Sequence, residues 1–200
     1  MSLVSAATLR EYLPEIQGVS VDTDLNSLLS RTEEMIAKWL GLPGVSPGLA
    51  ESTLTLYIDG PTSTNSSVLQ LPIRPLVSVS SVHSDPNLEY GSSTEISVSD
   101  LILNLEWSRL ILKPTVSTRG FVHSYRGNKV VGIFGFSASS PPSDLVHAIC
   151  VWASQLQRQK QTLGKLSIGQ RGNSITPAIP KMPEEVKEIL RPFRSPSVLM

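Results

Sequence analysis

The sequence has few of the features that usually carry chemistry. Cys150 is its single cysteine, so one chain forms neither an internal disulfide nor a cysteine metal site. Its place within an apolar helical run predicts a buried, inert thiol. No apolar run is long enough to span a bilayer, and no basic stretch leads into an apolar leader. We therefore expect no membrane contact and a protein that is cytosolic where it is made.

The sequence also lacks an excess of charge of either sign, because its 17 Lys and Arg residues equal its 17 Asp and Glu residues. This balance excludes strong general attraction to nucleic acid or membranes. The charge is unevenly distributed, however. Most charged residues within 1–112 are acidic, whereas Asp144 is the one acidic residue between Lys113 and Arg171. Two interpretations stay open: scatter over solvated faces, or head-to-tail packing in which unlike surfaces of neighbouring subunits meet around a ring.

No catalytic, cofactor or metal site is predicted. His83, His123 and His147 lie far apart, without the closely spaced partners of a helical zinc motif. No serine occurs in a Gly-x-Ser-x-Gly sequence. Three tryptophans lie within apolar patterns and are predicted to be core residues: Trp39, Trp107 and Trp152.

Helices are predicted near both ends of the chain. Ser5 is positioned to cap a short first helix, and Asp22 or Asp24 to cap a longer one that ends at Gly41. Residues 143–161 repeat apolar side chains at helical spacing after Pro142, and Pro183 opens a short helix over 184–190. Residues 162–180, rich in Gly and Pro, are predicted to form an extended arm.

The middle of the chain is predicted to be rich in strands. Apolar residues alternate with polar ones over 54–58 and 77–82, and shorter strands are expected near 68–71, 101–103 and 110–112. The run 129–136 leads through a turn of small residues into the helix after Pro142. Gly132 and Gly135 within this run indicate close packing or a bulge.

These patterns predict an α+β fold in which N- and C-terminal helices pack together with a β-rich middle region, followed by an extended C-terminal arm. We expect one domain over residues 1–161, with helical parts 1–45 and 142–161 around a β-rich part 50–138. Residues 162–200 form the arm and its short C-terminal helix.

The order of elements resembles the head-to-tail connector (adaptor) proteins of tailed bacteriophages. The residues that carry this resemblance are 8–13, the helix 24–41, the run Leu71 to Val82, the strand-to-helix junction with Pro142 to Leu145, and residues 183–193. Their order along the chain is more specific than any one of them.

The resemblance implies a structural virion protein without enzymatic activity. It implies a ring, commonly of twelve subunits, beneath the portal and around the channel through which DNA leaves, in the neck between head and tail. Its expected partners are further copies of itself, the portal and downstream neck or tail proteins. Alternatives are a head-closure or tail-terminator ring protein, a small hydrolase and a DNA-binding module.

Basic and apolar residues near the C-terminus are the predicted partner-binding site. The basic residues from Arg158 to Arg171 follow one another without an acidic residue between them, as non-specific contact with genomic DNA requires, although an acidic protein surface fits equally well. The predicted residues are Arg158, Lys160, Lys165, Arg171, Ile189, Leu190, Arg191 and Phe193.

Overall fold

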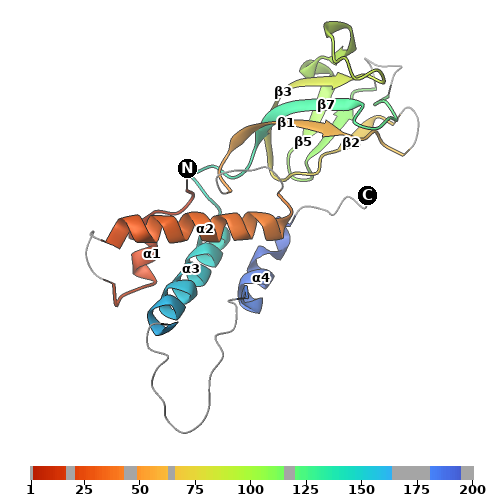
Figure 1. Ribbon diagram of the computed structural model, residues 1–200. Coiled ribbons are helices and arrows are strands. Elements are labelled where there is room, and N and C mark those ends of the chain that lie inside the picture. Colours follow the sequence, from red (N-terminus) through yellow and green to blue (C-terminus); the bar gives the residue numbers. More distant parts are fainter. Residues whose placement is uncertain are drawn as a thin grey trace. The chain divides into compact units, whose positions relative to one another are not determined.

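The computed structural model describes residues 2–16, 21–42, 49–62, 66–114, 120–163 and 181–194, apart from the side chains of 160–163. The described chain divides into two compact units, each considered by itself (Figure 1). The helical unit is formed from Met1–Leu40, Ser46–Leu49 and Ser137–Pro192, and the β-rich unit from Gly41–Val45, Ala50–Phe136 and Phe193–Met200.

The helical unit contains α1 (Ala6–Glu11), α2 (Asp22–Leu40), α3 (Ser143–Leu163) and α4 (Glu184–Leu190). Helix α3 contacts each of the other three, and α1 also contacts α2. Burial of one apolar face of each helix therefore holds segments from both ends of the chain together. The fully buried side chains include Leu9, Leu25, Leu29, Ile36, Leu145, Ile149, Val186 and Leu190.

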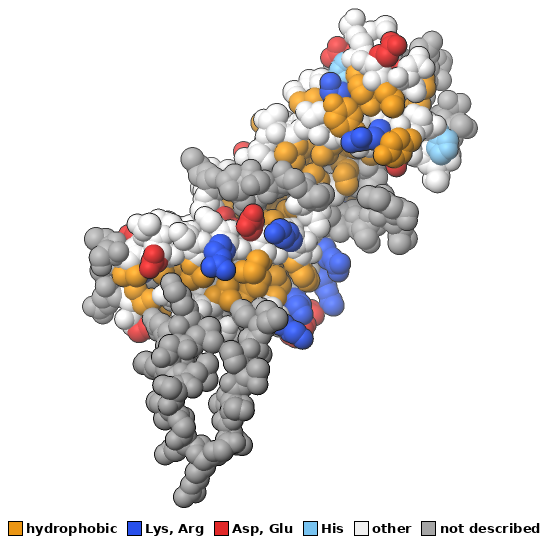
Figure 2. Space-filling view, viewed as in Figure 1, with side chains coloured by type: hydrophobic (Ala, Val, Ile, Leu, Met, Phe, Trp, Pro, Cys, Tyr) orange, Lys and Arg blue, Asp and Glu red, His pale blue; other side chains and the backbone are white. Residues whose placement is uncertain are grey.

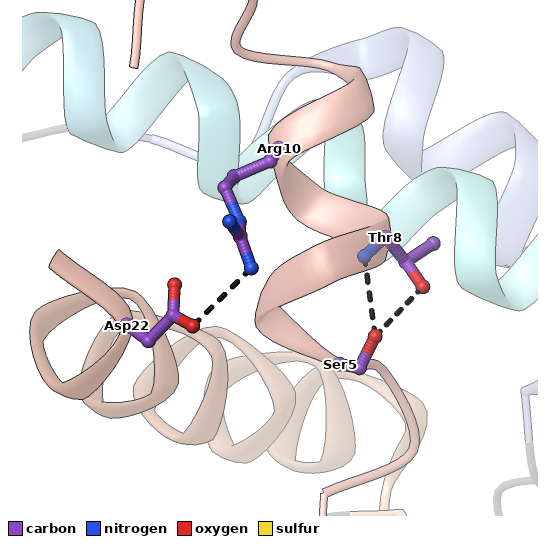
Figure 3. Close-up of polar contacts among 4 residues, drawn as sticks. All are labelled: Ser5, Thr8, Arg10 and Asp22. Atoms are coloured by element: carbon purple, nitrogen blue, oxygen red, sulfur yellow. Dashed lines mark hydrogen bonds and ion pairs between the residues drawn. The ribbon is translucent and has the colours of Figure 1, made fainter. Parts of the chain in front are cut away.

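Local contacts define where these helices begin and end. The Ser5 hydroxyl accepts a hydrogen bond from the Thr8 backbone N–H at 3.1 Å, so Ser5 caps α1 as predicted (Figure 3). An ion pair of 3.2 Å between Arg10 and Asp22 links α1 to the first residue of α2. Gly41 follows α2 with a φ of 76°, the left-handed conformation that its position predicted.

The β-rich unit contains two antiparallel sheets. The larger sheet has the order β1-β7-β3-β4, formed by Ser52–Ile58, Asn128–Phe134, Leu76–Ser84 and Glu95–Ile96. The smaller has the order β2-β6-β5, formed by Val68–Gln70, Arg109–Leu112 and Leu101–Asn104. In the central strand β7, alternate residues are buried, as the period of two requires.

Two glycines allow close backbone approach near the end of β7. A Cβ atom on Gly132 would lie 2.5 Å from the Ser78 carbonyl oxygen, and one on Gly135 would lie 2.6 Å from the Ala50 carbonyl oxygen. Gly135 also has a φ of 114°, which side chains disfavour. The close packing predicted for these two glycines is confirmed.

The α+β class and the packing of N- and C-terminal helices with one another are confirmed. Within the described chain, α4 packs on α3 and belongs to the helical unit, and the boundary expected at 161/162 stays a prediction. Residues 164–180, which include most of the predicted arm, lie outside the described residues.

The prediction that all three tryptophans are core residues is wrong for Trp107, which is 46% exposed, although Trp152 is buried. Trp107 lies in the turn between β5 and β6. The guanidinium carbons of Arg74 and Arg109 lie 4.9 and 5.9 Å from the centroid of its ring. The apolar residues around it in the sequence belong to two strands, whereas the turn itself is at the surface.

Candidate assembly surfaces

The predicted partner-binding residue Arg158 is held within the helical unit. Its guanidinium pairs with Glu15 at 3.0 Å and donates a second hydrogen bond to the Tyr12 carbonyl oxygen at 3.2 Å. The hydrogen bond from Arg158 lowers the pKa of the Glu15 carboxyl. Arg158 therefore ties α3 to the residues after α1, and its side chain remains 55% exposed.

Of the four other predicted basic side chains, the structure describes that of Arg191 alone. Lys160 lies on α3 without a described side chain, and Lys165 and Arg171 lie outside the described residues.

The predicted residues around α4 differ in how far they are buried. Leu190 is fully buried and belongs to the core of the helical unit, and Ile189 is half-buried. Arg191 is exposed and pairs with Glu188 at 3.2 Å. Phe193 packs edge-on against Phe136 in the β-rich unit, with ring centroids 5.6 Å apart. The solvent-facing residue of this set on the helical unit is thus Arg191.

A buried carboxylate anchors the N-terminal segment in the helical unit. Glu33 of α2 is 1% exposed, and its Oε1 atom accepts hydrogen bonds from the Ser2 hydroxyl at 2.6 Å and from the Leu3 and Val4 backbone N–H groups at 2.9 and 3.3 Å. Burial raises the pKa of Glu33, and these hydrogen bonds oppose the rise. These hydrogen bonds attach the N-terminal segment to α2, which indicates a structural role for Glu33.

The β-rich unit carries a cluster of aromatic and basic side chains that sequence reasoning missed. Tyr57 and Tyr90 have ring centroids 5.5 Å apart. The Arg126 guanidinium lies 5.3 Å from the Tyr57 centroid and 6.0 Å from that of Tyr125, and the Lys129 ammonium lies 5.5 Å from that of Tyr90. We call Tyr57, Tyr90, Tyr125, Arg126 and Lys129 the aromatic-basic cluster. Figure 2 shows basic side chains lying among hydrophobic ones on this unit.

Three loops hold the aromatic-basic cluster in place. The buried Asp85 carboxylate accepts hydrogen bonds from the backbone N–H groups of Asn87, Glu89 and Tyr90, which lower its pKa. The Tyr90 hydroxyl donates a hydrogen bond to the Arg126 carbonyl oxygen at 2.6 Å, and the backbone N–H of Arg126 donates one to the Asp59 carboxylate at 2.7 Å. Because the loops are tied to one another, the exposed rings are ordered before any partner arrives.

Tyrosine and arginine are common at the energetic centres of protein interfaces, because they combine large apolar area with a polar end. Tyr57 is 45% exposed and Tyr125 is 72% exposed. Within the described residues, Arg126 and Lys129 form no salt bridge with a carboxylate. The cluster thus presents positive charge and aromatic surface, a combination suited to a partner that bears carboxylates.

The described residues hold no group of three or more His, Cys, Asp and Glu side chains that could bind a metal ion. The Cys150 thiol is buried as predicted, and burial raises its pKa to about 12, which makes it a poor nucleophile near neutral pH. Among the described helices, none is both long and apolar enough to cross a membrane.

Comparison with solved structures places this fold in a known group. A chain described as "Neck of empty GTA particle computed with C6 symmetry" aligns with a TM-score of 0.61 at 19% identity, over 98% of this chain and 92% of that one. "Neck of native GTA particle computed with C12 symmetry" aligns with a TM-score of 0.57 at 18% identity, over 96% and 89% of the two chains.

A third chain, from "Virion of native gene transfer agent (GTA) particle", aligns with a TM-score of 0.54 at 20% identity, over 92% of this chain and 82% of that one. No protein-family model and no curated protein matches the sequence. The chain therefore has the fold of chains in the neck and virion of gene transfer agent particles. At the level of the fold, this confirms the resemblance to head-to-tail connectors.

Proposed function

We propose that this protein is a structural neck component of a tailed phage or phage-like particle, and specifically its head-to-tail adaptor. In this role it forms a ring beneath the portal, joins the DNA-filled head to the tail and surrounds the DNA exit channel. The observation that carries the proposal is the match to a neck chain over 98% of this chain and 92% of that one. Because the match covers nearly all of both chains, the helical and the β-rich regions of this protein both have counterparts in the neck chain.

A ring of about twelve copies is supported by the symmetry of the similar necks, which were computed with C12 and C6 symmetry. A cyclic ring requires two different surfaces on each subunit, one for each neighbour. The acidic early sequence and the basic later sequence supply charge of both signs for such contacts.

We assign the contact with the portal, a neighbour or the DNA channel to the basic end of α3 and the residues after it, together with the surface of α4. Arg158, Lys160, Lys165 and Arg171 provide positive charge, and Ile189, Arg191 and Phe193 provide partly or fully exposed surface. Leu190, which is buried, contributes by holding α4 in place.

The test is reconstitution of the full chain with the portal protein of the same particle. We expect cryo-electron microscopy to show a ring of this protein bound to the portal, with about twelve copies, and native mass spectrometry to give the same stoichiometry. A protein that stays monomeric and unbound with portal present contradicts the proposal. Binding to the end of a tail tube in place of the portal favours a tail-terminator, and salt-sensitive binding of duplex DNA by the free protein favours a DNA-binding module.

A further inference from the structure

The strand β1 forms an open edge of the larger sheet. Within the described residues it pairs with β7 alone, in a continuous register from Ser52 opposite Phe134 to Ile58 opposite Asn128. It contains no charged residue and no proline, and its pairing with β7 has no bulge. Charged residues, prolines and bulges usually protect an edge strand from pairing with another chain, and β1 has none of them.

The side chains of β1 are also incompletely covered. Thr53, Thr55 and Tyr57 are exposed, and the residues between them, which face the core, are only half-buried. In the central strand β7, by contrast, the core-facing Val130 and Phe134 are fully buried. A chain lying along β1 would complete the burial of its apolar side chains.

The opposite edge of the same sheet has the opposite charge. This edge is β4, in which Glu95 is exposed and has no salt bridge within the described residues. Glu95 lies opposite His83 of β3, His83 opposite Lys129 of β7, and Lys129 opposite Tyr57 of β1. One row across the sheet thus runs from the aromatic-basic cluster at one edge to a carboxylate at the other.

The strand directions allow these two edges to meet in separate copies of the chain. Each neighbouring pair in the sheet is antiparallel, so β1 runs parallel to β3 and antiparallel to β4. A second copy placed beside the first in the same orientation would therefore set its β4 antiparallel to β1. The alternation of the sheet would continue across the contact.

We propose that the β1 edge with its aromatic-basic cluster binds the β4 edge of a second copy of this chain, as a head-to-tail contact of the ring. The inference rests on the proposed function, because it supplies one contact between neighbouring ring subunits. Continuing the row places Glu95 of the next copy beside Tyr57, Arg126 and Lys129. In the same register, Thr55 lies opposite Ser97 of the next copy. Since β4 has only two residues, side chains provide more of this contact than a backbone ladder does.

A second copy fits this edge better than nucleic acid does. The cluster offers two cationic side chains beside three tyrosines, whereas binding to a duplex backbone depends on many phosphate contacts. A heterologous contact between unlike edges leaves the pair of copies with one free β1 edge and one free β4 edge, so that the next copy can add in the same way.

Charge exchange tests the contact, with self-association measured by sedimentation velocity and the portal-bound ring by electron microscopy. The variant Arg126→Glu with Lys129→Glu has two negative edges, and Glu95→Lys has two positive edges. We expect each alone to associate at least about tenfold more weakly than wild type, because like charges meet at the contact. An equimolar mixture should regain association, because each copy then meets only neighbours of opposite charge. The control Glu106→Lys, an exposed change in the turn between β5 and β6 of the smaller sheet, should leave association unchanged.

Disulfide trapping tests the register, using the double variant Thr55→Cys with Ser97→Cys in the full chain under mild oxidation. We expect a ladder of covalent oligomers beyond the dimer, from concentrated free protein or from the portal-bound ring, and little cross-linking of either single variant. Efficient dimerisation of Thr55→Cys alone would mean that β1 pairs with another β1 and would overturn the proposal. A portal-bound ring without trapping, or with unchanged assembly of both charge variants, would overturn the contact while the adaptor function stands. A ladder without portal binding would support the contact and count against the adaptor function.

Discussion

Gly135 shows how one residue fixes the path of the backbone just after β7. We expect Gly135→Ala to lower the free energy of unfolding by about 2–4 kcal/mol, because the added Cβ would meet the Ala50 backbone at a φ of 114°. The matched control is Gly91→Ala, where the nearest atom is 4.0 Å from the new Cβ, and it should change stability by less than about 0.5 kcal/mol. Urea denaturation measures both. Equal effects of the two substitutions would contradict this account.

Glu33 is predicted to make stability depend on pH. Burial raises the pKa of Glu33 above its value in the unfolded chain, so the native state binds the proton more tightly. Its contribution to stability is therefore fully present below the unfolded pKa of about 4.3 and is lost as pH rises through the higher folded pKa. The amide introduced by Glu33→Gln does not titrate and keeps an oxygen that can accept the bonds from Ser2, Leu3 and Val4. The stability of wild type relative to this variant should thus fall as pH rises from about 4 to 7.

Denaturation of both proteins across that pH range checks the prediction, and a difference that is constant or rises with pH would contradict it. Glu33→Ala supplies the comparison for the hydrogen bonds. It should destabilise by about 1–3 kcal/mol at all of these pH values, because the buried Leu3 and Val4 N–H groups lose their acceptor.

At the scale of the element, α4 combines a core face with a solvent face. We expect Leu190→Ala to lower the free energy of unfolding by about 2–4 kcal/mol, because Leu190 is fully buried. Arg191→Glu should change it by less than about 0.5 kcal/mol, since Arg191 is exposed and pairs with Glu188 at the surface. If α4 contacts the portal, Arg191→Glu should nevertheless weaken portal binding, measured by biolayer interferometry. Lys181→Glu, an exposed change before α4, is the control for charge alone.

The elements differ in how far the sequence predicts them. Ser5 and Gly41 fix helix ends through contacts within a few residues, so their roles were predictable. The strand β4 was not predicted, because two residues are too few for an alternating pattern. The aromatic-basic cluster was missed for another reason: Tyr57, Tyr90 and Arg126 come from three loops or strand ends, and only the pairing of β1, β7 and β3 brings them together. Strand order depends on long-range contacts that no local pattern contains.

At the scale of the whole molecule, the β-rich unit is a nearly continuous segment of chain, whereas the helical unit is built from segments on both sides of it. A continuous segment with its own buried core can fold by itself. The core side chains of this unit include Leu69, Leu71, Ile73, Val82, Leu110, Phe121, Val130 and Phe134. The N-terminal helices lack this independence, because α1 and α2 bury their apolar faces against α3, which follows more than a hundred residues later.

We therefore expect a protein comprising residues 49–137 to fold alone, with a circular dichroism spectrum typical of strands and a cooperative thermal transition. It should be slightly less stable than the same unit in the full chain, because it lacks Phe193, whose edge-on contact with Phe136 is worth about 0.5–1.5 kcal/mol. Residues 2–42 alone should show little helix, since α2 without its partners is a marginal helix in water. Amide hydrogen exchange should find the slowest amides of the isolated β-rich unit in the central strands β7 and β3. A non-cooperative transition, or fast exchange throughout, would mean that this unit depends on the helices for its fold.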